Sequence, residues 1–332
     1  MNGQSDEMAP CCAPTRTAGT TRRLDVVPLI SETRDVDIVS APVSGPRVQN
    51  GLVNITGGEF LMGTDDPAGF PADGEGPVRR VTVRPFRIAR HAVTNDQFAA
   101  FVAATAYTTE AERFGWSFVF HLLIEGRRGL TVKGTSGPAP WWLGVADACW
   151  LAPEGTGSTL EGRGDHPVVH VSWNDARAYC AWASVRLPTE AEWERAARGG
   201  LEQKRYPWGN ELTPDKKHRC NIWQGQFPTR NTTEDGFLGT APVTAYRPNG
   251  YGLYNVAGNV WEWCADWFSA TYHVEGPREN PIGPPDGNSR VVRGGSYLCH
   301  RSYCNRYRVG ARSGNTPDSS TGNTGFRVAA DA

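Results

Sequence analysis

Glycine and proline interrupt this sequence so often that they limit which folds it can adopt. The 332 residues include 38 glycines and 24 prolines, about 19% of the chain against roughly 12% in average proteins. Such frequent breaks favour turns and loops over long helices or strands. A chain of this length can still bury a sizeable core in one or two domains. We therefore expect an irregular, loop-rich α+β fold.

Three short helices are indicated by residues that can cap a helix N-terminus. The starts are Thr94 with Gln97, Ser172 with Asp175, and Thr189 with Glu192. The first and third have the spacing of a capping box. Positions i and i+2 face different sides of a helix, so Glu190, Glu192 and Glu194 are expected to form a cap and a solvated face rather than a metal site.

Two stretches lack regular periodicity. Residues 1–47 are polar, and we expect a disordered tail ahead of a folded domain over 48–332. The adjacent Cys11 and Cys12 are interpreted as incidental thiols, with delivery of copper or reducing equivalents as the alternative. Residues 109–165 show little pattern but carry four tryptophans. Either this stretch forms a wall of a peptide-binding groove or it is a loop packed onto the core.

A cluster of reactive residues lies near the C-terminus. Residues 293–308 contain two cysteines, one histidine, three tyrosines and four arginines. A thiolate is a nucleophile and a soft metal ligand, and neighbouring cations favour it. The four-residue spacing between Cys299 and Cys304 differs from the Cys-x2-Cys of zinc and thioredoxin-type motifs. It allows a disulfide, two buried thiols or two ligands of one soft metal ion.

This segment closely resembles the active-site segment of the formylglycine-generating enzymes. Further motifs similar to that family are GGEFLMG at 57–63, HPVVHVSW at 166–173, RLPTEAEWE at 186–194, NGYGLYNVAGNVWEW at 249–263 and GFRVA at 325–329. The resemblance covers roughly residues 50–330. The cysteine pair and NTPDSS at 315–320 point to the formylglycine-generating branch itself.

The resemblance implies a single C-type-lectin-like domain that oxidises a cysteine side chain to an aldehyde with O2. Its substrate would be a Cys-x-Pro-x-Arg segment of an unfolded sulfatase, and a thiol reductant would assist. Dioxygen reacts slowly with closed-shell organic groups, so a redox metal or flavin is expected. No dinucleotide fingerprint follows a strand. Two thiolates suit Cu(I), so Cys299 and Cys304 are the expected copper ligands, and the substrate thiolate would supply a third sulfur.

Other residues take roles from the same resemblance. Ser296 and Tyr303 would hydrogen-bond the reacting oxygen, and Trp261 would pack beside the site. The positions expected to contact the peptide are Ala111, Ser117, Trp142, His300 and Asn323. His300 can also orient the site from behind the ligands. Trp116 replaces an acidic residue and Ala92 a glutamate of some relatives, which leaves open how the substrate arginine is bound.

Two oxygen-rich segments are candidates for structural Ca2+ sites. Calcium accepts mixed shells of carboxylate, amide and carbonyl oxygens. The residues alone also fit ordinary Asn-Gly turns, but the resemblance implies calcium at both segments. The expected ligands are Asn221, Ile222, Asp235 and Phe237 in the first, and Asn255, Gly258, Val260 and Glu262 in the second.

Composition narrows the setting of the protein. A net charge of −1 gives no bulk field for nucleic acid or an anionic membrane. No apolar run suggests a spanning helix or signal peptide, so we expect a cytoplasmic monomer. Cys180 matches a disulfide position of secreted relatives, but the matching partner position is Val328, and another such position is Val309. Both departures favour a reducing compartment.

Two other functions are compatible with the fold. An iron-dependent, sulfur–carbon bond-forming oxygenase of the ergothioneine type would need clustered histidines. The chain has seven histidines, and none shows a His-x3-His-x-Glu pattern. A non-catalytic lectin-like module would have no need for both Cys299 and Cys304.

Overall fold

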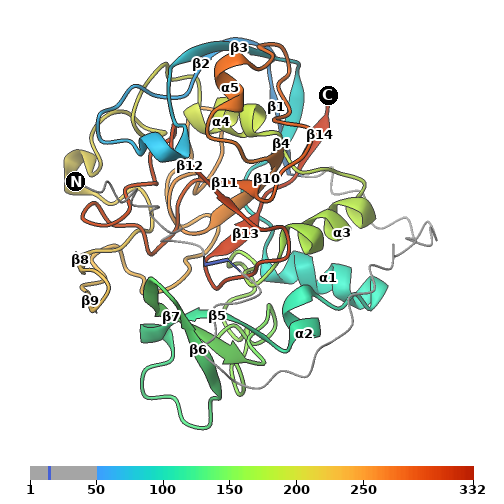
Figure 1. Ribbon diagram of the computed structural model, residues 1–332, viewed down its shortest axis with the longest axis vertical. Helices are drawn as coiled ribbons and strands as arrows, with labels where there is room; N and C mark the ends of the chain where they lie inside the picture. The colour runs from blue at the N-terminus through green and yellow to red at the C-terminus, as the bar shows by residue number, and fades with distance from the viewer. Residues whose placement is uncertain (1–13, 16–50) are drawn as a thin grey trace, which may run out of the picture.

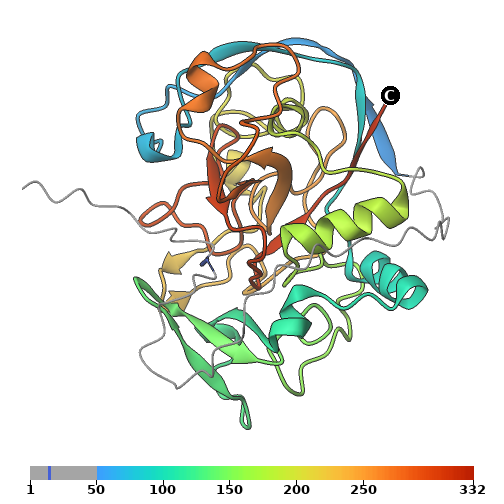
Figure 2. The ribbon, with the colours of Figure 1, turned by 45° about the vertical axis from the view of Figure 1, so that its right-hand side comes forward.

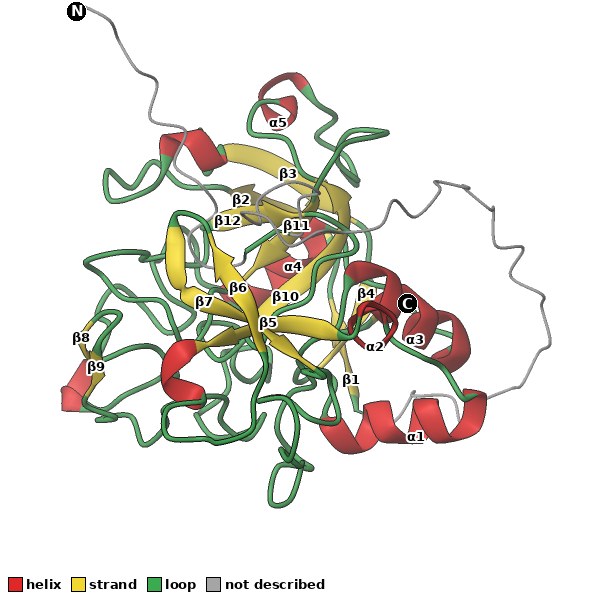
Figure 3. Cartoon of the chain, turned by 60° about the horizontal axis from the view of Figure 1, so that its bottom comes forward, coloured by secondary structure: helices red, strands yellow, loops and turns green. Residues whose placement is uncertain are grey.

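The computed structural model describes residues 14–15 and 51–332 (Figure 1). Except for Pro14 and Thr15, the expected tail lies outside the described residues. Within them, short strands form five small sheets, and long loops fill much of the space between elements (Figure 3). No helix in this part of the chain is long and apolar enough to cross a membrane. The predicted loop-rich α+β class is confirmed.

Two sheets hold the ends of the domain together. In one, β4 lies between β1 and the C-terminal β14. In the other, the order is β12-β11-β10-β13, with β10 and β13 parallel. The bounds are β1 Leu52–Ile55, β4 Phe86–Ala89, β10 Trp261–Trp267, β11 Arg290–Arg293, β12 Arg312–Asn315, β13 Thr324–Phe326 and β14 Ala329–Asp331. Figure 2 shows the red C-terminal strand crossing toward the blue and cyan N-terminal strands.

The remaining sheets are peripheral. A hairpin joins β2 (Gly58–Met62) to β3 (Arg79–Val83), and another joins β8 (Gly225–Gln226) to β9 (Arg230–Asn231). The third is the sheet β5-β7-β6, built from Trp116–Phe120, Ala139–Ala146 and Val132–Ser136. This sheet corrects the expectation that 109–165 has little regular structure. Gly134 lies at a register shift between β6 and β7, and such an irregularity hides the strand alternation in the sequence.

The helices begin where the capping signals indicate. Thr94, Ser172 and Thr189 are N-caps, and each forms a complete capping box. The α-helices are α1 Asn95–Thr105, α2 Glu110–Phe114, α3 Trp173–Ala183, α4 Glu190–Arg198 and α5 Tyr272–Glu275, with 3-10 turns at Pro71–Asp73, His121–Leu123 and Pro214–Lys216. Side chains of α1 and α3 pack into one core cluster with Trp261, Cys299 and Cys304. The fold therefore carries the cysteine pair in its interior.

The prediction that the glutamates of α4 form a solvated face is wrong. Glu190, Glu192 and Glu194 are all buried. Glu190 accepts hydrogen bonds from Arg293 and Arg312, and Glu194 accepts from Arg293. Buried charges persist when they are paired and hydrogen-bonded, so these carboxylates join α4 to β11 and β12.

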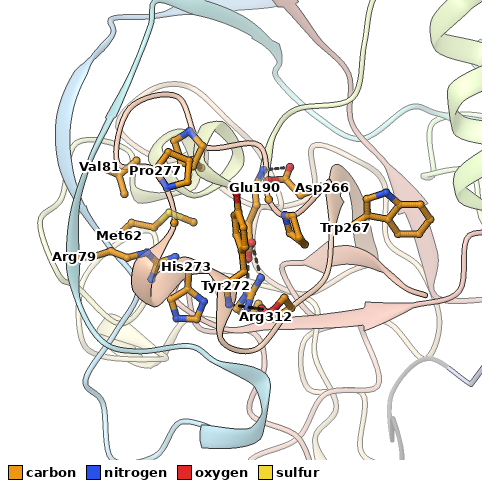
Figure 4. A pocket seen from close by; sticks show the side chains of 16 residues that line it. Met62, Arg79, Val81, Glu190, Asp266, Trp267, Tyr272, His273, Pro277 and Arg312 are labelled. Carbon is orange, nitrogen blue, oxygen red and sulfur yellow. Dashed lines mark hydrogen bonds and ion pairs between the residues drawn. The ribbon is translucent and has the colours of Figure 1, made fainter. Parts of the chain in front are cut away.

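A buried carboxyl group lies beside this cluster. Asp266 accepts a hydrogen bond from the backbone N–H of Glu190 at 2.8 Å, and both line a small cavity with Arg312 (Figure 4). Burial, followed by the charge of Glu190, raises the pKa of Asp266 to about 8. The folded chain therefore holds a proton here that the unfolded chain releases near pH 4.

This proton makes stability depend on pH. Between pH 4 and pH 8 the native state binds more protons than the unfolded state, so raising the pH lowers the free energy of unfolding. Asp266→Asn keeps the acceptor oxygen and removes the titration. We expect the melting temperature of the wild type to fall between about pH 6 and pH 8.5, and that of Asp266→Asn to fall less. Equal pH dependence in the wild type, Asp266→Asn and the exposed control Asp215→Asn would contradict this assignment.

Candidate active site

The loop that carries the cysteines begins where β11 ends. Gly294 and Gly295 follow Arg293 with φ of +92° and +73°, a region that glycine adopts without steric cost. A Cβ on Gly295 would lie 2.9 Å from the backbone oxygen of Arg306. Glycine therefore lets the start and end of this loop approach backbone to backbone.

Arg293 holds both ends of the loop. Its guanidinium donates to Glu190 at 2.8 Å, to Glu194 at 2.6 Å and to the backbone oxygen of Val309 at 2.7 Å. The side chain is almost fully buried. Removing one partner from such a buried ion pair typically costs about 3–5 kcal/mol. The cysteine loop is therefore anchored on the rigid α4–β11 unit.

Cys299 and Cys304 meet inside this loop. Their sulfur atoms are 3.3 Å apart, and both side chains are fully buried. The backbone N–H of Cys304 donates to the oxygen of His300 at 2.7 Å, which closes the turn between the two residues. Because a disulfide bond is about 2.05 Å long, the two sulfurs are adjacent but not bonded.

Hydrogen-bond donors surround the sulfurs. The backbone N–H of Ser296 points at Cys299 Sγ over 3.4 Å, and Arg306 Nη1 lies 3.7 Å from Cys304 Sγ. The Ser296 hydroxyl accepts a hydrogen bond from Asn323 Nδ2 at 2.9 Å. An N–H donor and a guanidinium thus point at the two sulfur atoms. Ser296 and Asn323, predicted as separate site residues, are thus directly bonded beside the thiols.

The other buried cysteines have different surroundings. Burial raises the pKa of the Cys180, Cys220 and Cys264 thiols, which keeps them protonated and unreactive at neutral pH. No disulfide joins any cysteines within the described residues. Cys299 and Cys304 differ from these buried cysteines because their two sulfur atoms lie close together.

Aromatic side chains form one side of the site. The Tyr303 ring stacks on Phe227 at 4.6 Å between centroids and meets Trp141 edge-on at 5.0 Å. Trp142, the predicted groove residue, is buried edge-on against Phe120. Adjacent strand residues point to opposite faces of a sheet, so the Trp141 side of β7 faces Tyr303. The sequence prediction missed Trp141 and Phe227.

Trp261 lies in the core cluster that contains both cysteines and is fully buried. Its backbone N–H donates to the oxygen of Asn323 at 2.8 Å. This bond attaches the start of β10 to the segment carrying Asn323. Trp261 therefore closes the apolar side of the site, where a water-filled space would otherwise weaken electrostatic contacts.

Ser117 reaches the same C-terminal segment from β5. Its hydroxyl donates to the backbone oxygen of Ser320 at 2.9 Å and pairs with His170 Nδ1 at 2.8 Å. The backbone N–H of Gly322 donates to the oxygen of Phe118 at 2.9 Å. These contacts place β5 along residues 320–322, next to Asn323.

Three further positions lie on different elements: Ala111, which is predicted to contact the peptide, and Trp116 and Ala92, which depart from some relatives. Ala111 is buried in α2, and Trp116 begins β5 with its ring edge-on to Phe118. Ala92 packs in a small buried cluster with Val169 and Val260.

His300 is half-buried at the turn of the cysteine loop, where its Nδ1 lies 2.7 Å from the Ser302 hydroxyl. Burial lowers its pKa. The structure thus gives His300 a position in the turn, while a role in substrate binding stays a prediction.

The first predicted calcium segment is brought together in space. Asp235 accepts hydrogen bonds from the backbone N–H groups of Ile222 at 3.0 Å and Phe237 at 3.1 Å. Burial raises the pKa of Asp235. Among the described residues, the buried Oδ1 of Asn221 has no hydrogen-bond partner. An orphaned buried oxygen next to a carboxylate fits a hard cation.

The second segment lies against the first. Gly258 has φ of +72°, and a Cβ there would lie 2.2 Å from the backbone oxygen of Asn221. Asn255 donates from Nδ2 to Pro242, while its buried Oδ1 finds no partner in the described part of the chain. Val260, two residues after Gly258, is also buried. The orphaned oxygens of Asn221 and Asn255 therefore belong to two adjoining segments.

Glu262 is engaged elsewhere. Arg327 donates to both carboxylate oxygens at 2.8 Å, and Trp193 Nε1 donates to Oε2 at 2.7 Å. Three donors use three of the roughly four lone-pair positions of a carboxylate. Glu262 thus acts first as the counter-ion of Arg327, and its role as a calcium ligand stays a prediction.

Residues that sequence reasoning left in the tail also contact the domain. Pro14 is buried and Thr15 half-buried. Asn315 Nδ2 donates to the backbone oxygen of Pro14 at 3.4 Å. Both views of the ribbon draw this dark-blue segment near the centre of the molecule, between the green β5–β7 sheet and the red C-terminal strands (Figures 1 and 2).

Comparison with known proteins gives strong matches. Residues 40–332 match the sulfatase-modifying factor enzyme 1-like domain. The chain is 64% identical over 292 residues to the formylglycine-generating enzyme of Thermomonospora curvata, covering 87% of this chain and 96% of that protein.

Two further relatives show how widely the fold is used. A Bos taurus protein named inactive C-alpha-formylglycine-generating enzyme 2 is 50% identical over 286 residues, covering 85% of this chain and 88% of that protein. The structure of PvdO from Pseudomonas aeruginosa has a TM-score of 0.62 at 25% identity and covers 85% of this chain and 94% of its own. The fold alone therefore does not fix the chemistry, which has to be argued from the site.

Proposed function

The chain belongs to the formylglycine-generating enzymes of the sulfatase-modifying factor enzyme 1-like family, and we propose that it is a copper-dependent oxidase of peptide cysteine. Its substrate is the cysteine of a Cys-x-Pro-x-Arg segment in an unfolded sulfatase, which it converts to Cα-formylglycine with O2. The observation that carries this proposal is the pair of buried sulfur atoms 3.3 Å apart at Cys299 and Cys304.

The thiol pair fits Cu(I). Thiolates are soft ligands that select Cu(I) among first-row metals, and sulfurs this close can both contact one ion. Within the described residues, no group of three or more His, Cys, Asp or Glu side chains is placed to hold a metal. In this proposal the two thiolates are the protein ligands, and the substrate thiolate would be the third. Copper would supply one-electron chemistry with O2, which closed-shell protein groups lack.

The protein's own groups would position the reacting atoms. Ser296 and Asn323 form a buried hydrogen-bonded pair beside Cys299, able to hold a polar group of the substrate. Tyr303 presents a hydroxyl next to the aromatic surface of Trp141 and Phe227. Such a surface suits the proline of an extended peptide. Trp261, fully buried in the core cluster of both cysteines, would keep water out of the site.

The iron-oxygenase alternative has no support in the histidines. His170 pairs with Ser117, His166 with Thr240, and His91 with the backbone of Ala92. Each ring is thus held in a separate local contact. A purely structural, lectin-like role leaves the proximity of the two thiols unexplained.

Loss of one thiol should abolish turnover. With Cys299→Ala or Cys304→Ala, one soft ligand remains where two are required, and we expect kcat/KM to fall by more than about 100-fold. The measurement is mass spectrometry of a Cys-x-Pro-x-Arg peptide incubated with Cu(I), O2 and a thiol reductant. Conversion of thiol to aldehyde lowers the peptide mass by about 18 Da.

Cys180→Ala is the matched control, because it removes a buried thiol of the same core cluster. It should keep wild-type activity. Normal turnover by the Cys304→Ala enzyme would show that the two-thiolate site is wrong.

Calcium is proposed as a structural cofactor that cross-links loops. A ligand that binds only the native state adds RT ln(1 + [L]/Kd), about 2.7 kcal/mol at a hundredfold excess. We therefore expect a chelator to lower the melting temperature of the wild type. Asn221→Ala and Asn255→Ala should each show a smaller chelator-induced shift, because each removes an orphaned oxygen.

The readout is the shift caused by the chelator, which separates calcium binding from any direct effect of the substitution. Asn210→Ala, at an exposed position outside both segments, should respond like the wild type. Identical melting curves of the wild type with and without chelator would remove calcium from the account.

A further inference from the structure

The N-terminal segment of this chain contains the substrate pattern proposed above. Residues 12–16 read Cys-Ala-Pro-Thr-Arg, which matches Cys-x-Pro-x-Arg at every specified position. Of the eight cysteines, only Cys12 is followed by proline two positions later and arginine four positions later. The adjacent Cys11 is out of register by one residue. The pair therefore contains one cysteine that fits the pattern and one that does not.

The structure places Pro14, which belongs to this pattern, against the end of β12. Pro14 and Thr15, its third and fourth residues, are the described positions within the first 50 residues. Pro14 is buried and accepts a hydrogen bond through its backbone oxygen from Asn315. A main-chain contact of this kind is how extended peptides are commonly held, whatever their side chains.

Asn315 leads directly to the thiol site. It ends β12 and begins the segment 315–323. Farther along that segment, Ser320 bonds to Ser117, and Asn323 bonds to Ser296. The Ser296 backbone in turn donates to Cys299 Sγ. The chain segment 315–323, together with these hydrogen bonds, thus connects the Pro14 contact with the sulfur pair.

The spacing within the motif limits where its cysteine can lie relative to the bound proline. In any Cys-x-Pro-x-Arg peptide, the cysteine precedes the proline by two residues, so their Cα atoms are at most about 7 Å apart. A peptide with its proline held at this position can present its cysteine only within that radius. Because the segment belongs to the same chain, its effective concentration at the site can reach roughly the millimolar range.

We propose that this protein binds its own residues 12–16 as a substrate and oxidises Cys12 to formylglycine. The inference rests on the proposed function and adds an intramolecular substrate to it. A segment that only blocked the site would not need a cysteine two residues before its proline, yet the sequence has Cys12 there. While bound, the segment also competes with sulfatase peptides.

The reaction requires O2 and a thiol reductant. The C–S bond of Cys12 breaks, a C=O bond forms, and the sulfur leaves as hydrogen sulfide. One oxygen atom enters the aldehyde, and the other becomes water with two electrons and two protons from two reductant thiols, which form a disulfide. Atoms and electrons balance, and no other co-reactant is needed.

The first test is mass spectrometry of the full-length protein after incubation with Cu(I), O2 and the reductant. We expect the peptide containing both cysteines to lose about 18 Da once, with fragmentation placing the loss at Cys12. Cys11 is the internal control. Pro14→Ala should slow the conversion, whereas Pro28→Ala, which changes a proline outside the motif, should not.

A second test needs no turnover. A fluorescent peptide with serine in place of the motif cysteine is titrated into the metal-free protein, and its Kd is measured by anisotropy. If the segment fills the groove nine-tenths of the time, its release lowers the apparent Kd about tenfold. We expect Pro14→Ala to bind the probe more tightly than the wild type and Pro28→Ala to match the wild type.

The outcomes separate this inference from the proposed function. Conversion of an added peptide while Cys12 keeps its thiol would overturn self-oxidation and leave the enzyme activity intact. An unchanged Kd in Pro14→Ala would overturn occupation of the groove. If neither the added peptide nor Cys12 is converted, the proposed function itself fails.

Discussion

The ion pairs of Arg293 are the interaction on which this site depends. One buried guanidinium joins Glu190 and Glu194 of α4 to the end of β11 and to the backbone of Val309. The cysteine loop lies between residue 293 and residue 309, so its two ends are fixed to the same rigid helix. Loops without such anchors sample many conformations, and two thiols would then rarely be 3.3 Å apart. The cysteine loop can keep one conformation without regular secondary structure because buried ion pairs hold it in place.

The same principle extends to the rest of the loop. Arg308 forms two bonds of 2.7 Å with Glu75, and Arg306 reaches both Asp73 and Cys304 Sγ. Residues early in the domain therefore hold the C-terminal side of the cysteine loop. Arg306 therefore both anchors the loop, through Asp73, and contacts a reactive sulfur. The orphaned oxygens of Asn221 and Asn255 mark where the proposed calcium ions would complete the cross-linking elsewhere.

Local signals in the sequence predicted local structure well, and long-range pairing was harder to predict. Thr94, Ser172 and Thr189 identified three helix starts because a capping box lies within four residues. The burial of Glu190 was missed because its partners Arg293 and Arg312 are more than 100 residues away. The sequence does not show which face of β7 points toward Tyr303, so it does not distinguish Trp141 from its neighbour Trp142. The composition of the tail does not reveal the match of residues 12–16 to the substrate pattern, which depends on the order of individual residues.

The central claim is that two protein sulfurs hold Cu(I) and leave a place for a substrate sulfur. X-ray absorption at the copper edge of the Cu(I)-loaded protein tests it most directly. With the motif cysteine of the chain replaced by Cys12→Ser, the account predicts two sulfur neighbours and no nitrogen, rising to three sulfurs when a Cys-x-Pro-x-Arg peptide is added. A first shell containing histidine nitrogen, or a sulfur count unchanged by the peptide, would contradict it.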